Sequence, residues 1–174
     1  ACPETNGLAE VKVKASKQGT RCLHIQSGFE KTWWVWSATT QAFLHNIIET
    51  IRWLGDPSAS AYLRRHGEQC TALILCPGML VEFMKTPFPQ NHPAPFGKQT
   101  TTGLFLGYEV FPGGKWAGDY HVVEYAPFQK DPDMPMSGPG AKAVKKYRHR
   151  IKEVKPLKTS DDRFRFPLAE RKRI

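Results

Sequence analysis

One carboxylate and three basic side chains recur at helical spacing near the start of the chain. Glu10, Lys14, Lys17 and Arg21 lie three or four residues apart, so a helix would place them on one face. Taken alone, Glu10 is a solvated acid with Lys14 as its i+4 partner, a pair that contributes about 0.3–0.5 kcal/mol. The basic residues favour either a solubilising face or a surface that contacts nucleic-acid phosphates. Both interpretations stay open at this point.

A second group of basic side chains lies near the end of the chain. The net charge is +9, and residues 1–140 carry 12 basic and 12 acidic residues, whereas residues 141–174 carry 13 and 4. Such a block is typical of a solvated tail and also of a protein that binds a polyanion. The candidate DNA contacts in this block are Lys145, Lys146, Arg148, Arg150 and Lys152.

The cysteine and histidine residues form no metal-binding motif. Cys2, Cys22, Cys70 and Cys76 contain no C-x-x-C pair, and no His pair follows them at zinc-finger spacing. Their wide spacing favours free thiols and a reducing compartment. No apolar run approaches the ~18 residues of a membrane span, and no basic-then-apolar leader follows Ala1. We therefore expect a soluble nuclear or cytoplasmic protein without a membrane partner.

The most specific string in the chain is Pro3-Glu4-Thr5-Asn6-Gly7-Leu8-Ala9-Glu10. It resembles the P-x-x-N-G-x-A-E stretch of retroviral and retrotransposon integrases. Further matches to copia-type elements follow in the same order: Arg21, Ser27-Gly28, Trp33-Trp34, Ala38, residues 62–67, 96–98, 103–108, 120–123, 151–154 and 164–167. The ordered series resembles the integrase region of a copia-type retrotransposon polyprotein over nearly the whole chain.

This resemblance implies the chemistry of the D, D, E enzymes, which transfer phosphoryl groups during DNA integration. In that family the Glu at the position of Glu10 is the third catalytic carboxylate and a ligand of Mg²⁺ or Mn²⁺. Such hard cations prefer oxygen ligands, and two of them support in-line phosphoryl transfer. The resemblance also implies that Lys14, Lys17 and Arg21 contact DNA.

The two family aspartates precede the Asn-Gly-x-Ala-Glu string, whereas this chain has no Asp before Asp56. We therefore expect part of an integrase that is inactive as an isolated chain and holds no metal by itself. The expected partners are DNA, as element ends and target, the missing upstream part of the integrase, and a second copy through self-association. A non-enzymatic nucleic-acid-binding module and a protein-interaction domain remain as alternatives.

Helical periodicity predicts the elements that position these residues. Residues 5–27 form a helix that ends at Gly28, residues 30–54 a Trp-rich helix, and residues 58–65 a short helix before Gly67. We expect the apolar stripe of the first helix to lie against the Trp-rich helix or to remain partly exposed. That stripe comprises Leu8, Val11, Ala15 and Cys22.

Beyond these helices the pattern favours short strands, predicted at 71–76, 79–85, 104–110, 120–125 and 163–168, with a loop at 88–97. Pro77-Gly78 and Pro112-Gly113-Gly114 are typical of turns. The expected fold is therefore α+β. It combines two or three helices, implied by the resemblance to be a remnant of a ribonuclease-H-like core, with a small antiparallel barrel or sheet and a basic tail. The expected segments are 1–68, 69–126, a Pro/Gly-rich linker at 127–143 that is too poor in apolar residues to pack, and 144–174.

Overall fold

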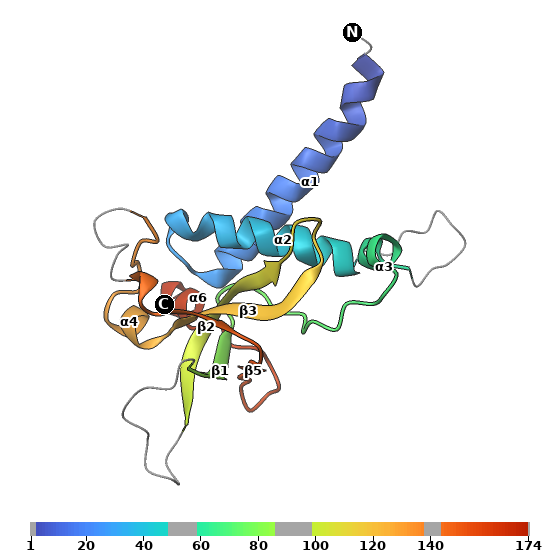
Figure 1. The fold of residues 1–174 in the computed structure, drawn as a ribbon. Helices are drawn as coiled ribbons and strands as arrows, with labels where there is room; N and C mark the ends of the chain where they lie inside the picture. The colour runs from blue at the N-terminus through green and yellow to red at the C-terminus, as the bar shows by residue number, and fades with distance from the viewer. Residues whose placement is uncertain (1–2, 49–58, 86–98, 138–143, 174) are drawn as a thin grey trace.

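The computed structural model describes residues 3–48, 59–85, 99–137 and 144–173 (Figure 1). Its elements are α1 (Pro3–Ser27), η1 (Lys31–Trp33), α2 (Trp34–Ile48), α3 (Ala61–His66), β1 (Leu80–Met84), β2 (Thr100–Val110), β3 (Trp116–Glu124), α4 (Ala126–Lys130), β4 (Arg148–Ile151), β5 (Lys155–Pro156) and α6 (Pro167–Lys172). The predicted loop at 88–97 and the end of the second predicted helix, from residue 49, lie outside the described residues. None of the described helices combines the length and the hydropathy needed to cross a membrane.

The five strands form one antiparallel sheet in the order β4-β3-β2-β1-β5. Strand β2 pairs with β1 and β3, while β5 extends the β1 edge and β4 extends the β3 edge. The predicted α+β class and antiparallel pairing are thereby confirmed. Among the described residues no ladder joins β4 to β5, so the sheet is open and is not a closed barrel.

The sheet must nevertheless be strongly curled. Only residues 152–154 separate β4 from β5, and four Cα steps reach at most about 14 Å. In a flat sheet four strand spacings would hold these outer strands about 19 Å apart. One surface hollow is lined by Met84 of β1 and Ile151 of β4, although these strands are not neighbours in the sheet. Curling brings the two edges of the sheet toward each other.

Both faces of the sheet are covered, because six consecutive residues of β2 are buried. One face packs against α2 and α3 through Phe43, Tyr62, Val81, Phe105 and Val122. The opposite face packs through Phe29, Trp33, Leu104, Leu106, Val123, Phe128 and Leu168. All four predicted segments contribute residues to these two clusters.

Helix α2 lies directly on β2. The Thr40 hydroxyl donates to the Leu106 carbonyl at 3.1 Å. A Cβ on Gly107 would lie 2.9 Å from Thr40 Oγ1 and 3.2 Å from the Trp36 ring, so this strand position needs glycine for the close approach. The Gly103–Tyr108 block of the sequence is therefore the place where the helical and strand layers meet.

Two predicted strands are wrong. Residues 71–76 join no ladder; instead the Tyr108 and Tyr120 hydroxyls hydrogen-bond the backbone of Leu73 and Leu75. Residues 163–168 contribute only an isolated bridge between Lys158 and Phe164 before α6 begins. Pro167 occupies the first turn of α6, where its missing N–H costs no hydrogen bond.

The expectation that residues 127–140 are too poor in apolar residues to pack is wrong for their described part. Phe128 of α4 is completely buried against the rings of Phe29 and Trp33. Trp33 Nε1 donates to the Met134 carbonyl at 2.8 Å. The Met136 N–H also donates to Thr32 Oγ1 at 2.8 Å, so a buried ring and long-range hydrogen bonds hold this Pro-rich segment on the body. The predicted basic tail is likewise folded: it supplies β4, β5 and α6.

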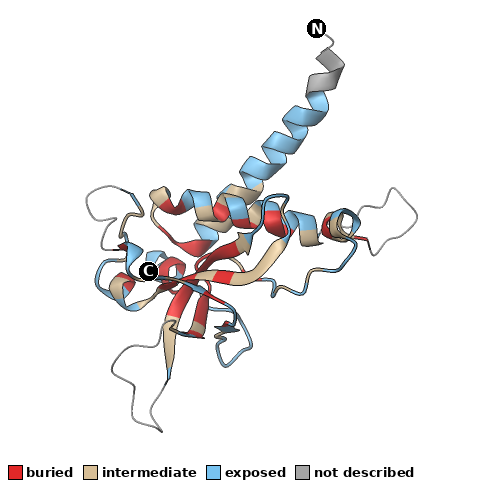
Figure 2. Cartoon of the chain, viewed as in Figure 1, coloured by how far each residue is buried: buried red, intermediate tan, exposed pale blue. Residues whose placement is uncertain are grey.

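Helix α1 projects from this body (Figures 1 and 2). The helix predicted at 5–27 is confirmed, although it begins two residues earlier, and its stop is confirmed because α1 ends at Ser27 and Gly28 has φ 71°. Leu8 and Val11 are 72% and 63% exposed, and only the last turns of α1 pack on the protein. Cys22, Cys70 and Cys76 form no disulfide, as predicted, and Cys2 lies outside the described residues.

Candidate nucleic-acid interface

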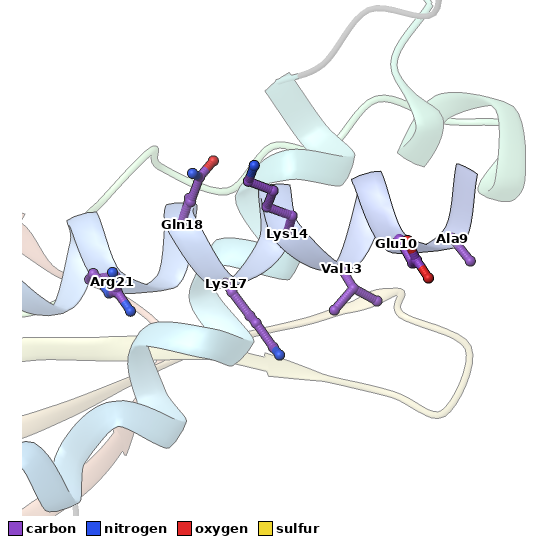
Figure 3. A pocket seen from close by; sticks show the side chains of 7 residues that line it. All are labelled: Ala9, Glu10, Val13, Lys14, Lys17, Gln18 and Arg21. Carbon is purple, nitrogen blue, oxygen red and sulfur yellow. The ribbon is translucent and has the colours of Figure 1, made fainter. Parts of the chain in front are cut away.

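Figure 3 shows the face of α1 that carries Glu10, Lys14, Lys17 and Arg21. These side chains and their neighbours line an open hollow along the helix, to which no other described element contributes. All four are exposed, and none has an ion-pair partner within the described part of the chain. The expected pair between Glu10 and Lys14 is therefore not formed, and the basic side chains are available to an external anion.

The donor set around Glu10 does not fit a two-metal site within this chain. Two divalent cations about 3.5–4 Å apart need several carboxylate oxygens. Among the described residues no group of three or more His, Cys, Asp or Glu side chains could hold a metal ion. Glu10 supplies one carboxylate on a helix that projects from the body.

Strand β4 places Arg148 and Arg150 on the same sheet face as His121 and Val123, their register partners in β3. Arg150 is already engaged: its Nε donates to Asp119 Oδ2 at 2.6 Å, and its Nη1 lies 3.5 Å from Glu109 Oε1. The hydrogen bond that Arg150 donates to Asp119 raises the pKa of the guanidinium above its usual value. Two carboxylates thus compensate this guanidinium.

Arg148 and Lys145 are not compensated in this way. Neither has a carboxylate partner among the described residues, and the Arg148 guanidinium lies 6.0 Å from the centre of the Trp36 ring. Both line a hollow of about 210 Å³ beside α2 and β4. Its other lining residues are Trp36, Leu106, His121, His149 and Arg150.

Lys146 and Lys152 flank this hollow in the sequence and are exposed. Lys146 Nζ lies 4.8 Å over the Tyr147 ring. Of the seven basic residues further on, three are paired: Lys158 with Asp162, Arg165 with Glu170 and Lys172 with Asp133. Uncompensated charge of the C-terminal block thus lies around β4 and also at Lys155, Arg163, Arg171 and Arg173, for which the described residues provide no carboxylate partner.

We call the hollow lined by Lys145 and Arg148 the β4 hollow. The sequence did not indicate the residues that shape it. The Trp36 and His121 rings are in tilted contact with their centres 4.9 Å apart, and His121 Nε2 lies 2.5 Å from Glu109 Oε2. Glu109 thereby links His121 to Arg150. These residues come from α2, β2 and β3, so no local spacing in the sequence could bring them together. The α1 and β4 hollows share no lining residue.

Comparison with protein-family models, with curated proteins and with solved structures found no match for this chain.

Proposed function

We propose that this chain is the DNA-contacting part of a copia-type integrase and that it binds DNA through phosphate contacts independent of base sequence. The observation that carries the proposal is the contrast among three basic residues that line the hollow beside β4. Arg150 is neutralised by Asp119 and Glu109, whereas Lys145 and Arg148 line a hollow without an acidic partner in the described residues. Uncompensated cations beside a concave surface favour a phosphate over solvent.

Helix α1 supplies a second contact surface in this proposal. Lys14 and Arg21 are seven residues apart, which is about 10 Å along a helix. With Lys17 between them, the row is long enough to contact several phosphates of one DNA strand. Because α1 projects from the body, DNA can approach this face without displacing packed side chains.

The proposed role of Glu10 rests on the resemblance of residues 3–10 to the integrase string. In the complete site Glu10 is one of three carboxylates that ligate Mg²⁺ or Mn²⁺ for DNA integration. The described residues provide no further donors for that site, so the proposal assigns this chain DNA binding and no catalysis by itself. The remaining carboxylates belong to the upstream part of the integrase.

The test is fluorescence anisotropy with labelled duplexes of two unrelated sequences. If about six phosphates are contacted, affinity falls by roughly a thousandfold between 50 and 200 mM salt. The double variant Lys145→Ala, Arg148→Ala should weaken binding to both duplexes at least about tenfold and lower the salt slope by about two. Arg150→Ala is the matched control: it removes one positive charge from the same strand and should change affinity less than threefold, about 0.6 kcal/mol.

The variant Lys14→Ala, Lys17→Ala, Arg21→Ala measures the contribution of α1 to DNA affinity in the same assay. Loss of affinity in this variant alone would move the interface to the helix. Equal losses of affinity in Lys145→Ala, Arg148→Ala and in Arg150→Ala would refute the β4 surface. The pairing of Arg150 with carboxylates would then make no difference to DNA binding. Absence of binding by the intact chain at 50 mM salt would refute DNA contact altogether.

A second candidate function is protein interaction through α1. Leu8, Val11 and Ile25 are all more than 60% exposed on this helix. In the resembling family the corresponding helix belongs to the catalytic core, so the missing upstream part is the proposed partner, with self-association as the alternative. Sedimentation of the intact chain tests the latter: Leu8→Gln, Val11→Gln should abolish any association that depends on this stripe.

A further inference from the structure

Residues 71–76 have the composition of a strand but belong to no ladder. The segment reads Thr-Ala-Leu-Ile-Leu-Cys, and no charged residue occurs between Glu68 and Glu82. Short neutral runs rich in β-branched and aliphatic residues pair readily with other extended chains. Leu73 and Ile74 are 45% and 59% exposed, which is unusual for adjacent large aliphatic side chains.

Two buried tyrosines occupy the inner edge of this segment. The Tyr120 hydroxyl accepts from the Leu73 N–H at 3.0 Å, and the Tyr108 hydroxyl accepts from the Leu75 N–H at 2.8 Å. The Tyr108 hydroxyl donates to the Leu73 carbonyl at 2.7 Å. The backbone groups of residues 73 and 75 therefore point to the same side, which is the geometry of an extended chain.

In an extended chain the backbone groups of alternate residues point in opposite directions. Those of Ala72, Ile74 and Cys76 consequently face outward. Two of them are engaged locally: the Ala72 N–H bonds the Cys70 sulfur, and the Cys76 carbonyl accepts from Met79 N–H. The described residues provide no hydrogen bond to the other four, which are the Ala72 carbonyl, both groups of Ile74 and the Cys76 N–H.

These four groups are complementary to themselves. In an antiparallel pair with Ile74 opposite Ile74 of a second copy, each Ile74 N–H faces the carbonyl of the other Ile74. Two residues away, each Cys76 N–H faces the Ala72 carbonyl of the other copy. This register satisfies all four unbonded groups and needs neither of the two that are already engaged. A charged partner segment would find no opposite charge here, whereas an identical neutral segment fits.

We propose that residues 72–76 form a docking edge at which a second copy of this chain adds its own residues 72–76 as an antiparallel strand. The twofold axis passes between the two Ile74 residues. Such an isologous contact closes on itself, so the product is a dimer and not a fibre. Tyr108 and Tyr120 position the edge by holding its inner side. The proposal does not depend on DNA binding or on the α1 stripe.

The first test is sedimentation of the intact 174-residue chain over loading concentrations up to about 1 mM, because so small an interface is weak. We expect a monomer–dimer equilibrium. Ile74→Lys should raise the dissociation constant at least about tenfold, since it places two cations directly opposite each other. Phe111→Lys is the control: Phe111 is 55% exposed in another turn and receives the same charge.

The second test addresses the register and remains informative if Ile74→Lys impairs folding. In a Cys22→Ser background, Ile74→Cys should form an intermolecular disulfide between the two copies of residue 74 under mild oxidation. Residues opposite each other in such a pair have Cα atoms about 5.5 Å apart, which suits a disulfide. Leu73→Cys should form no 73–73 link, because Leu73 faces Leu75 of the other copy.

Peptide mapping by mass spectrometry identifies the linked residues. A dimer that weakens tenfold in Ile74→Lys and links through residue 74 supports the proposal. A strictly monomeric chain, an equal effect of Phe111→Lys, or a 73–73 link as abundant as the 74–74 link would overturn it. Loss of the dimer in Leu8→Gln, Val11→Gln with no effect of Ile74→Lys would also overturn it and assign association to α1.

Discussion

Helices α1 and α2 both carry apolar stripes at helical spacing, yet only α2 is covered along its length. In α2 the buried residues include Thr40, Phe43 and Leu44, which lie on β2. In α1 the corresponding positions Leu8 and Val11 are exposed to solvent. The same 3.6-residue periodicity therefore predicts a helix correctly in both places but does not say what packs against it. Four comparisons test this contrast.

The largest effect on stability is expected at Trp33, the residue immediately before α2. Trp33 is fully buried, and its ring contacts Phe29 and Phe128. Trp33→Ala should lower the free energy of unfolding by about 3–5 kcal/mol, because it opens a cavity and removes the Met134 hydrogen bond. Its neighbour Trp34 is 56% exposed, and Trp34→Ala should change stability by less than about 0.5 kcal/mol. Urea unfolding followed by circular dichroism compares the two; equal effects would contradict the described burial.

The junction between α1 and η1 should be the next most sensitive place. Gly28 has φ 71°, and a Cβ there would lie 2.2 Å from the Ala169 nitrogen. Gly28→Ala should cost about 2–5 kcal/mol from backbone strain and overlap with α6. Gly67 has φ 74° with no atom within 4 Å of its Cβ position, so Gly67→Ala should cost only about 1 kcal/mol. Thermal unfolding of both variants measures the difference, and a similar cost at both sites would refute the close contact with α6.

A smaller effect is expected from His24, where α1 meets α2. Burial lowers the pKa of His24 below its usual 6.5, and its Nδ1 lies 3.2 Å from the Ser37 hydroxyl. The unfolded chain then binds the proton more readily than the folded one. Stability should therefore be constant above pH 6.5 and decrease as pH falls from 6.5 toward the lowered folded value. Urea midpoints measured across this range should show the decrease in the parent chain and less of it in His24→Asn. An identical pH dependence of the two proteins would exclude His24 as its source.

The smallest effect is expected in the projecting part of α1. Leu8→Ala should change stability by less than about 0.5 kcal/mol, since its side chain buries little surface. Leu44→Ala is the matched control on α2 and should cost about 2–5 kcal/mol, because Leu44 is 7% exposed. A large cost of Leu8→Ala would mean that α1 is covered in solution, which sedimentation would then identify as association.

Local signals predicted much of the fold correctly. Gly28 and Gly67 both adopt the left-handed conformation that their positions after a helix indicate. The Pro77-Gly78 and Pro112-Gly113-Gly114 turns and the strands β1, β2 and β3 also follow from local composition. The errors have a common cause. Residues 71–76 find tyrosine hydroxyls in place of a neighbouring strand, and Phe128 finds an aromatic pocket formed by residues about a hundred positions earlier.

The candidate interface shows the same division between what local sequence predicts and what tertiary contacts decide. Lys145, Arg148 and Arg150 are equivalent as basic residues in the sequence, but tertiary contacts with Asp119 and Glu109 compensate only Arg150. The sequence by itself determined where helices and turns form and where positive charge accumulates, because these depend on residues within a few positions of one another. Only the tertiary structure decided which helix is covered, which extended segment lacks a partner and which cations lack a counter-charge. Those outcomes depend on surfaces that residues distant in the sequence bring into contact.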